Sequence, residues 1–230
     1  MAIDASTEAC SVALTFNNQT ISEFELAPQS HSLLLLPMID RLLTKAGIKL
    51  AELDGLIFGQ GPGSFTGVRI GVGVAQGLAF AADLEVVGVS TLQLMAQRAY
   101  TMHQQVEVIA TIDARMSEVY AGYYKLNDQG IMEAVLSDIV LAPAKLVEYL
   151  SEHLIENQQV YGVGTGWDAY KNELESLKIN AGTPEILFPN AEELLEIGQY
   201  YFSKGVAVSA ESAQPVYVRD TVSWKKLPGR

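Results

Sequence analysis

An aspartate at the end of a short apolar strand is the first residue in this sequence suited to chemistry. Asp4 is followed by the segment Ala5–Glu8, which contains Ser6 and Thr7. An acidic strand end with a hydroxyl-bearing turn can hold Mg²⁺ and phosphates, but such turns normally contain glycines, which let backbone amides approach the phosphates closely. This turn has no glycine, and Glu8 adds negative charge. Two interpretations stay open: a structural turn and a nucleotide site.

A glycine-rich turn, Gly59 to Gly67, is the second candidate, because it joins a predicted strand to a predicted helix. The N-terminus of a helix after such a turn can bind an anion. The phosphate-binding loop of nucleoside triphosphatases is excluded because no Gly-Lys-Ser/Thr follows. The dinucleotide fingerprint is excluded because Thr66 stands where the third glycine belongs. A tight turn with close backbone packing is the alternative.

The second half of the chain repeats the first pattern. Ile112-Asp113-Ala114 resembles Ile3-Asp4-Ala5, and Gly164-Thr165-Gly166 forms another glycine turn. Arg115 follows so closely that a structural ion pair with Asp113 is favoured over a catalytic role. The repeat suggests that the chain has two related α/β lobes. The candidate residues for a vestigial nucleotide site are Asp4, Ser6, Thr7, Asp113, Gly164, Thr165 and Gly166.

The sequence indicates neither a catalytic nucleophile nor a metal site. His31, His103 and His153 are far apart, so no helix carries two histidines on one face, and we expect no metal site. Cys10 has no histidine nearby in the sequence, and no serine has the nucleophile-elbow context. We therefore predict no catalytic residue.

Two predicted helices have unusual surfaces. The first, from near Ser30 to Gly47, is apolar on more than one face, which indicates either a central helix or a helix that meets a partner. The second, ending near Ala82, has glycines four residues apart in two pairs, although each interior glycine costs roughly 0.5–1 kcal/mol relative to alanine. Close approach of another helix, inside the chain or on another subunit, would offset that cost. The candidate partner-binding residues are Leu33, Leu36, Met38, Ile39, Leu42, Leu43, Arg69, Ile70, Gly73, Val74 and Gly77.

The elements that carry these residues predict an α/β protein with two lobes. Hairpin strands over 11–26 lead into helix–strand units, and the same order restarts at Val106. We predict an N-terminal lobe over 1–104 that carries the partner-binding helices. A C-terminal lobe is predicted over 105–230, with its last segment packing back on the first lobe.

Composition limits the partners. The 230 residues carry 15 Lys and Arg against 27 Asp and Glu, a net charge of −12, so direct nucleic-acid binding by this chain alone is disfavoured. The only candidate basic patch is the tail, with Arg219, Lys225, Lys226 and Arg230. The most apolar stretch, Val68–Ala82, is short for a bilayer span and contains Arg69, so we expect a cytoplasmic protein with no membrane contact.

Several stretches of the chain, taken in order, resemble the TsaB family, also called YeaZ. The most specific is Gly61-Pro62-Gly63-Ser64-Phe65-Thr66-Gly67-Val68-Arg69-Ile70-Gly71. The others are Thr7–Leu14, Ile112–Arg115, Val163–Trp167 and Pro215–Arg219. The resemblance implies a two-lobed fold of the actin, sugar-kinase and Hsp70 type, which is RNase H-like, with a degenerate nucleotide site.

The same resemblance implies a function. Members of the family support the installation of threonylcarbamoyl on the tRNA adenosine next to the anticodon. They bind the catalytic subunit, TsaD, and an ATPase, TsaE, joins the pair. The family member is non-catalytic, self-associates as a homodimer through the same helices, and meets tRNA only indirectly. No cofactor is implied for this chain alone, but ATP or ADP is possible in the complex. TsaD holds a metal on a His-x-x-x-His pair, and the matching positions here are Thr91 and Met95.

Three functions are therefore compared. The leading hypothesis is the non-catalytic subunit of the tRNA-modifying complex. The alternative is a stand-alone ATP-dependent phosphotransferase or ATPase of the same fold, which glycines after Asp4 would have favoured. A metal-dependent peptidase lacks any ligand pair.

Overall fold

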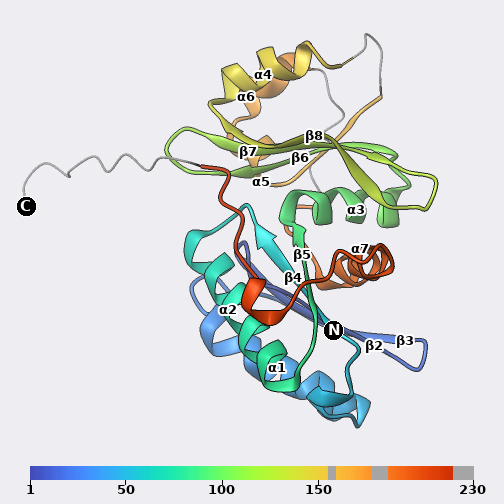
Figure 1. The fold of residues 1–230 in the computed structure, drawn as a ribbon. Helices are drawn as coiled ribbons and strands as arrows, with labels where there is room; N and C mark the ends of the chain where they lie inside the picture. Colours follow the sequence, from blue (N-terminus) through green and yellow to red (C-terminus); the bar gives the residue numbers. More distant parts are fainter. Residues whose placement is uncertain (155–158, 178–185, 220–230) are drawn as a thin grey trace, which may run out of the picture.

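A mixed β-sheet forms the centre of each of two stacked lobes (Figure 1). The computed structural model describes residues 1–154, 159–177 and 186–219; Lys225, Lys226 and Arg230 lie outside this part. In the first sheet the strand order is β3-β2-β1-β4-β5. Its strands are β1 (Ala2–Asp4), β2 (Ala9–Phe16), β3 (Gln19–Leu26), β4 (Leu56–Gly61) and β5 (Val86–Ser90). β1 pairs antiparallel with β2 and parallel with β4, which makes it the central strand of the first lobe.

The second sheet repeats the topology of the first. Its order is β8-β7-β6-β9, with β6 antiparallel to β7 and parallel to β9. Its strands are β6 (Glu107–Asp113), β7 (Val119–Leu126), β8 (Met132–Leu141) and β9 (Tyr161–Val163). Asp4 pairs with Ser11 at the end of the first hairpin, as Asp113 pairs with Val119 in the second. The predicted two-lobed α/β fold and its internal repeat are therefore confirmed.

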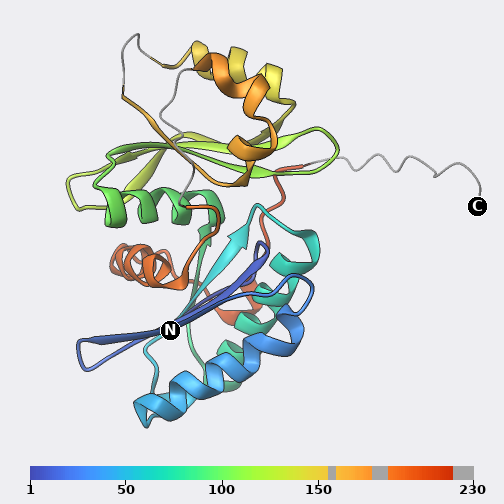
Figure 2. The same cartoon turned by 180° about the vertical axis from the view of Figure 1, so that it is seen from behind.

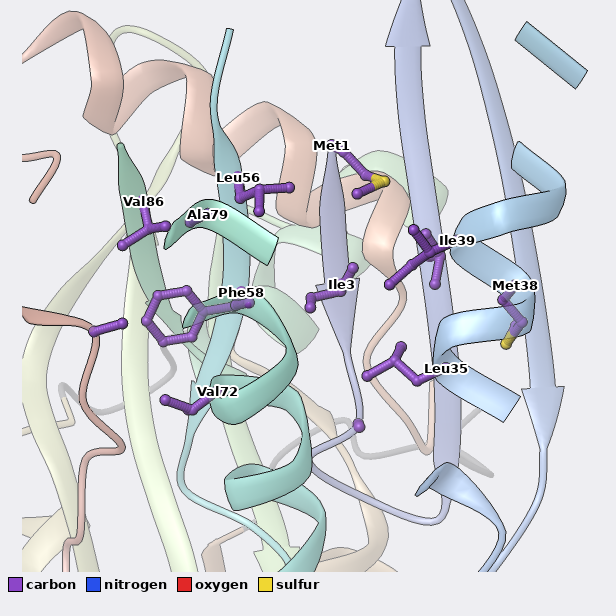
Figure 3. Packing of buried hydrophobic residues seen from close by; sticks show 14 of the residues in the cluster. Met1, Ile3, Leu35, Met38, Ile39, Leu56, Phe58, Val72, Ala79 and Val86 are labelled. Atoms are coloured by element: carbon purple, nitrogen blue, oxygen red, sulfur yellow. The ribbon is translucent and has the colours of Figure 1, made fainter. Parts of the chain in front are cut away.

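Helices cover the outer face of each sheet (Figures 1 and 2). On the first lobe these are α1 (His31–Ala46) and α2 (Phe65–Ala82), which bury an apolar cluster with β1, β2, β4 and β5. Figure 3 shows Leu35 of α1 and Val72 of α2 turned toward Ile3 and Phe58. On the second lobe, Leu146, Trp167 and Leu174 pack on β6 and β7. They belong to α4 (Pro143–Ser151), α5 (Thr165–Ala169) and α6 (Lys171–Leu174).

Two further helices fill the space between the sheets. In Figure 1, α3 (Thr91–His103) lies under the second sheet and α7 (Ala191–Ser203) lies over the first. Leu92, Met95 and Ala99 of α3 are buried against β6 and β7, while α7 is buried against β1, β4 and β5. Arg98 of α3 pairs with Glu193 of α7 at 3.0 Å. The expected N-terminal range, 1–104, therefore contains α3, which packs on the second sheet. The expected C-terminal range, 105–230, contains α7, which packs on the first sheet.

Local contacts set several of the helix ends. Ser90 caps α3 by accepting from Leu92 N, and Gly47 ends α1 with a φ of 71°. Ser30, the residue before α1, makes no capping bond with its side chain. Asn190 caps α7 by accepting from Glu192 N, and Glu193 in the first turn pairs with Arg98.

One helix of the described residues, α2, is long and apolar enough to cross a membrane by length and composition alone, with a mean hydropathy of 1.3 over 18 residues. Packing within the chain accounts for part of this apolar character, because four side chains of α2 are buried in the core of the first lobe: Val68, Val72, Ala75 and Ala79.

Candidate functional site

The carboxylate of Asp4 is closed into the first lobe. It accepts hydrogen bonds from Ser6 N at 3.2 Å and from Ser6 Oγ at 2.9 Å. A Cβ added at Gly59 would overlap Asp4 Oδ2, so the backbone of β4 lies directly against the carboxylate. Burial raises the pKa of Asp4 to about 6, although both bonds from Ser6 favour the ionised form. Asp4 lies beneath the cleft rather than in its wall.

The glycine-rich turn before α2 packs on the turn that follows Asp4. Ser64 N donates to Ser6 O at 2.7 Å. A side chain at Gly63 would overlap Ser6 O, and one at Gly67 would overlap Ala5 O. Ser64 Oγ accepts from Gly67 N at 3.3 Å. The glycines here therefore permit close backbone contact, which agrees with the tight-turn interpretation of the sequence.

A cleft of about 330 Å³ opens between the lobes beside these turns. An ion-pair chain crosses it: Arg115 contacts Asp113 at 2.8 Å and Glu8 at 3.3 Å. Tyr170 OH donates to Asp113 Oδ1 at 3.2 Å. The charged side chains that line the cleft are Glu8, Asp113, Arg115 and Arg219. Both arginines are paired with carboxylates, so neither is left free to attract a polyphosphate. Arg115 therefore forms the structural ion pair that the sequence favoured.

The seven predicted nucleotide-site residues separate into two groups. Ser6, Thr7 and Asp113 line the cleft. The glycine turn 164–166 is not among the lining residues: Gly164 has a φ of 99°, a Cβ there would overlap Thr111 O, and Thr165 Oγ1 accepts from Asp113 N at 3.2 Å. That turn holds the start of α5 against β6. The structure brings only part of the predicted site together.

The predicted partner-binding residues of α1 also separate into two groups. Met38, Ile39 and Leu42 are buried in the core, as Figure 3 shows for the first two, which removes them from the candidate surface. Leu43 is half-buried against the same core. Leu33 and Leu36 remain on the outside, 74% and 50% exposed. The sequence showed that the helix was apolar on several sides, but not which side faced the sheet.

The outer face of α2 is open. Arg69, Gly73 and Gly77 are exposed, and Ile70 and Val74 are half-buried. A Cβ added at Gly73 or Gly77 would meet no atom within 4 Å. We refer to Leu33, Leu36, Gly73, Gly77 and Phe80 as the α1–α2 outer face. Phe80 is 69% exposed, and sequence reasoning missed it. Its spacing was the available signal, because it lies three residues after Gly77 and so shares that side of the helix.

A second hollow was also missed. It has a volume of about 540 Å³ and lies between the first turns of α2 and the segment 216–219. Phe65 and Arg69 form one wall, and Tyr217 and Arg219 form another. The available signal was the four-residue spacing of Phe65 and Arg69, which places them one helical turn apart. We refer to this hollow as the Arg69 groove.

Metal-binding groups do not gather within the described residues, where no three His, Cys, Asp or Glu side chains could share an ion. His31 is buried, with its Nε2 atom 3.2 Å from Ala9 O. Thr91 and Met95 are both fully buried in α3.

Comparison with protein families finds a match over residues 16–226 to the model described as TsaD, tRNA N6-adenosine threonylcarbamoyltransferase. A protein of Escherichia coli K12 is 44% identical, over 100% of this chain and 98% of its own length. A protein of Haemophilus influenzae is 43% identical, over 100% and 97%. Both are named tRNA threonylcarbamoyladenosine biosynthesis protein TsaB.

A solved structure agrees with these relatives. YeaZ from Pseudomonas aeruginosa superposes with a TM-score of 0.82 at 42% sequence identity, covering 94% of this chain and 97% of that one. The two-lobed arrangement described above is thus shared with a structure of similar sequence over nearly its whole length.

Proposed function

Because the chain belongs to the TsaB family of tRNA threonylcarbamoyladenosine biosynthesis proteins, we propose that it is a non-catalytic subunit of the complex that modifies the tRNA adenosine next to the anticodon. Its role is to bind and support a TsaD-like threonylcarbamoyltransferase. The family model matched by this chain describes such a transferase, so the two subunits would share one fold.

The α1–α2 outer face is the single observation that carries this proposal. Leu33, Leu36 and Phe80 are large apolar side chains exposed on two helices that lie side by side (Figures 1 and 2). Gly73 and Gly77 leave the backbone of α2 uncovered. Exposed apolar surface of this kind marks an interaction site, and small residues let a second helix approach closely.

The cleft supports a non-catalytic role. Asp4 is closed in by β4, and the turn after it is covered by the glycine-rich turn of α2. Glu8 and Asp113, bridged by Arg115, line the cleft beside the turn where the sequence predicted a nucleotide site. We therefore propose that any ATP or ADP used by the complex binds to another subunit or at a junction between subunits.

The remaining partners follow from the same reasoning. The apolar outer face suits a homodimer as well as the catalytic subunit, and a TsaE-like ATPase would join the assembled pair. The net charge of −12 favours indirect contact with tRNA through the complex. We propose a cytoplasmic location, where that complex would meet tRNA.

The interface is tested by charging the outer face. Leu36→Glu places a carboxylate in the centre of the proposed contact, and Gly73→Arg fills the open backbone of α2. Each is expected to weaken binding of the TsaD-like subunit at least about a hundredfold, because a buried unpaired charge costs several kcal/mol. Isothermal titration calorimetry with the purified subunit of the same organism measures the loss.

Val135→Glu is the matched control, because Val135 is 49% exposed on β8 and Leu36 is 50% exposed on α1. The control should bind normally, and circular dichroism should show all three variants folded. Normal binding by both Leu36→Glu and Gly73→Arg would contradict the proposal.

A further inference from the structure

The Arg69 groove lies beside the α1–α2 outer face and has a different chemistry. Its walls are mainly apolar and aromatic, with Phe65, Val68, Tyr120, Val216 and Tyr217 among them. Figure 1 shows the red segment after α7 running along α2 toward the second sheet. Val216 N donates to Gln60 O at 2.8 Å, which anchors this segment against the end of β4. The groove is therefore a formed hollow between two anchored walls.

Arg69 is held in one orientation at the edge of this groove. Its guanidinium carbon lies 3.6 Å from the centre of the Phe65 ring and 5.6 Å from that of Tyr217. Arg69 Nε donates to Tyr217 OH at 2.7 Å. Two aromatic rings and one hydrogen bond thus fix the plane of the guanidinium and leave its terminal nitrogens free for another group.

The lack of an acidic partner sets Arg69 apart. Five arginines lie in the described part of the chain, and four of them form ion pairs, each with a carboxylate at 2.5–3.3 Å. Arg219 in the same groove is neutralised by Glu118 at 2.5 Å. Arg69 has no carboxylate within 4 Å among the described residues, although acidic residues outnumber basic ones by 27 to 15 in the sequence.

Position on the helix links the groove to the outer face. Phe65, Arg69, Gly73 and Gly77 are spaced four residues apart, so they form one stripe along α2. A partner that covers Gly73 and Gly77 would therefore extend toward Arg69. Aromatic residues and arginine are enriched in the buried centres of protein interfaces, and a preoriented guanidinium recognises a carboxylate through two parallel hydrogen bonds.

We propose that the Arg69 groove receives an acidic segment of the catalytic partner subunit, with an apolar side chain in the hollow and a carboxylate paired with Arg69. This inference rests on the proposed function, since it places the same partner on the same side of the first lobe. The chain's own tail is a poor occupant by charge, because residues 220–230 carry Lys225, Lys226 and Arg230 against the single acid Asp220.

Charge reversal tests the pairing. Arg69→Glu is expected to weaken binding of the purified TsaD-like subunit at least about tenfold at low salt, and the deficit should shrink as salt is raised. Arg69→Lys keeps the charge but loses the planar fork, so an intermediate loss is expected. Lys204→Glu is the matched control, because Lys204 also stacks on an aromatic ring, 5.0 Å from the centre of Tyr200, and should bind normally.

The outcomes separate the two proposals. If Leu36→Glu abolishes binding while Arg69→Glu does not change it, the acidic segment is wrong and the outer face stands. If neither matters, both are wrong. A salt-dependent change in the melting temperature of free Arg69→Glu would show pairing within the chain and overturn the inference. If Arg69→Glu does not fold, the neutral variant Arg69→Gln is measured instead. Its binding to the TsaD-like subunit should be weaker than that of the natural chain at low salt and should depend less on salt.

Discussion

The two sides of α2 carry the same residue type for opposite reasons. Gly67 and Gly71 face inward, where Ala5 lies directly against the helix. Gly73 and Gly77 face outward, where an added Cβ would meet nothing within 4 Å. In the sequence the two pairs look alike, since each is separated by four residues. Gly67 is explained by the fold of this chain, because a Cβ there would overlap Ala5 O. A Cβ at Gly71 would make only an ordinary contact with Ala5, and the outer pair has no explanation within the described residues.

The two sides of α2 differ in what offsets the free-energy cost of a glycine inside a helix. An interior helix glycine costs roughly 0.5–1 kcal/mol relative to alanine. At Gly67 that cost is offset within the monomer, because the turn after Asp4 could not pack against a larger residue. At Gly73 and Gly77 nothing in the described residues offsets it. A partner helix would do so, and this separates the two faces experimentally.

Gly67→Ala should give the largest effect on the inner side. The new methyl group would overlap the backbone carbonyl of Ala5, which cannot turn away as a side chain could. We expect a loss of about 3 kcal/mol in the free energy of unfolding, as for an overpacked core. Urea denaturation of the free chain measures it. A loss below that of an ordinary surface substitution would show that the inner face is not tightly packed.

Asp4→Asn tests the same side through pH. The pKa of Asp4 is about 6 when folded and 3.8 as a model value, so between these values the folded chain holds a proton that the unfolded chain has released. The stability of the natural chain should therefore fall as pH rises from 4 to 6, by about 2 kcal/mol from this group, and stay lower above pH 6. The asparagine variant should lack this component.

The measurement is the difference in unfolding free energy between the two chains at pH 4 and pH 7. This difference should shift by about 2 kcal/mol in favour of the variant between pH 4 and pH 7. Subtracting the two profiles cancels other titrating groups such as Asp138 and Glu193. The modification activity of the reconstituted complex should be nearly unchanged. A loss as large as that of an active-site variant of the transferase, with the subunits still associated, would contradict the non-catalytic role.

The double variant Gly73→Ala with Gly77→Ala should give the smallest effect on stability. It should stabilise the free chain, whereas Gly67→Ala should destabilise it. Each substitution is expected to stabilise the free chain by roughly 0.5–1 kcal/mol, because both positions are open and helical. Partner binding should weaken at the same time, because the methyl groups hold the second helix away. Thermal unfolding and calorimetric titration of the same sample measure the two effects. Stabilisation without loss of affinity would show that no helix packs closely there.

Features that depend on residues close in the sequence were predicted better than features that depend on tertiary contacts. The repeated strand–Asp–turn pattern correctly predicted two related sheets, and the closeness of Arg115 to Asp113 correctly predicted their ion pair. The outer face was only partly predicted. Leu33, Leu36, Met38 and Ile39 are all apolar, and burial divides them only after the sheet is in place. The spacing of Phe65 and Arg69 indicated one wall of the Arg69 groove, but the other wall was beyond sequence reasoning, because Tyr217 meets Phe65 only in the folded chain.

The placement of α3 and α7 between the two sheets also affects how the chain folds during synthesis. One face of the first sheet is covered by α7, whose residues 191–203 follow β5 only after all four strands of the second sheet. As the chain leaves the ribosome, the apolar side of β1, β4 and β5 has no cover from α7 until the second sheet has emerged. Late, long-range contacts of this kind slow folding and prolong the exposure of apolar surface to aggregation. Nascent chains that stop before α7 should therefore depend on chaperones, whereas chains that include α7 should not.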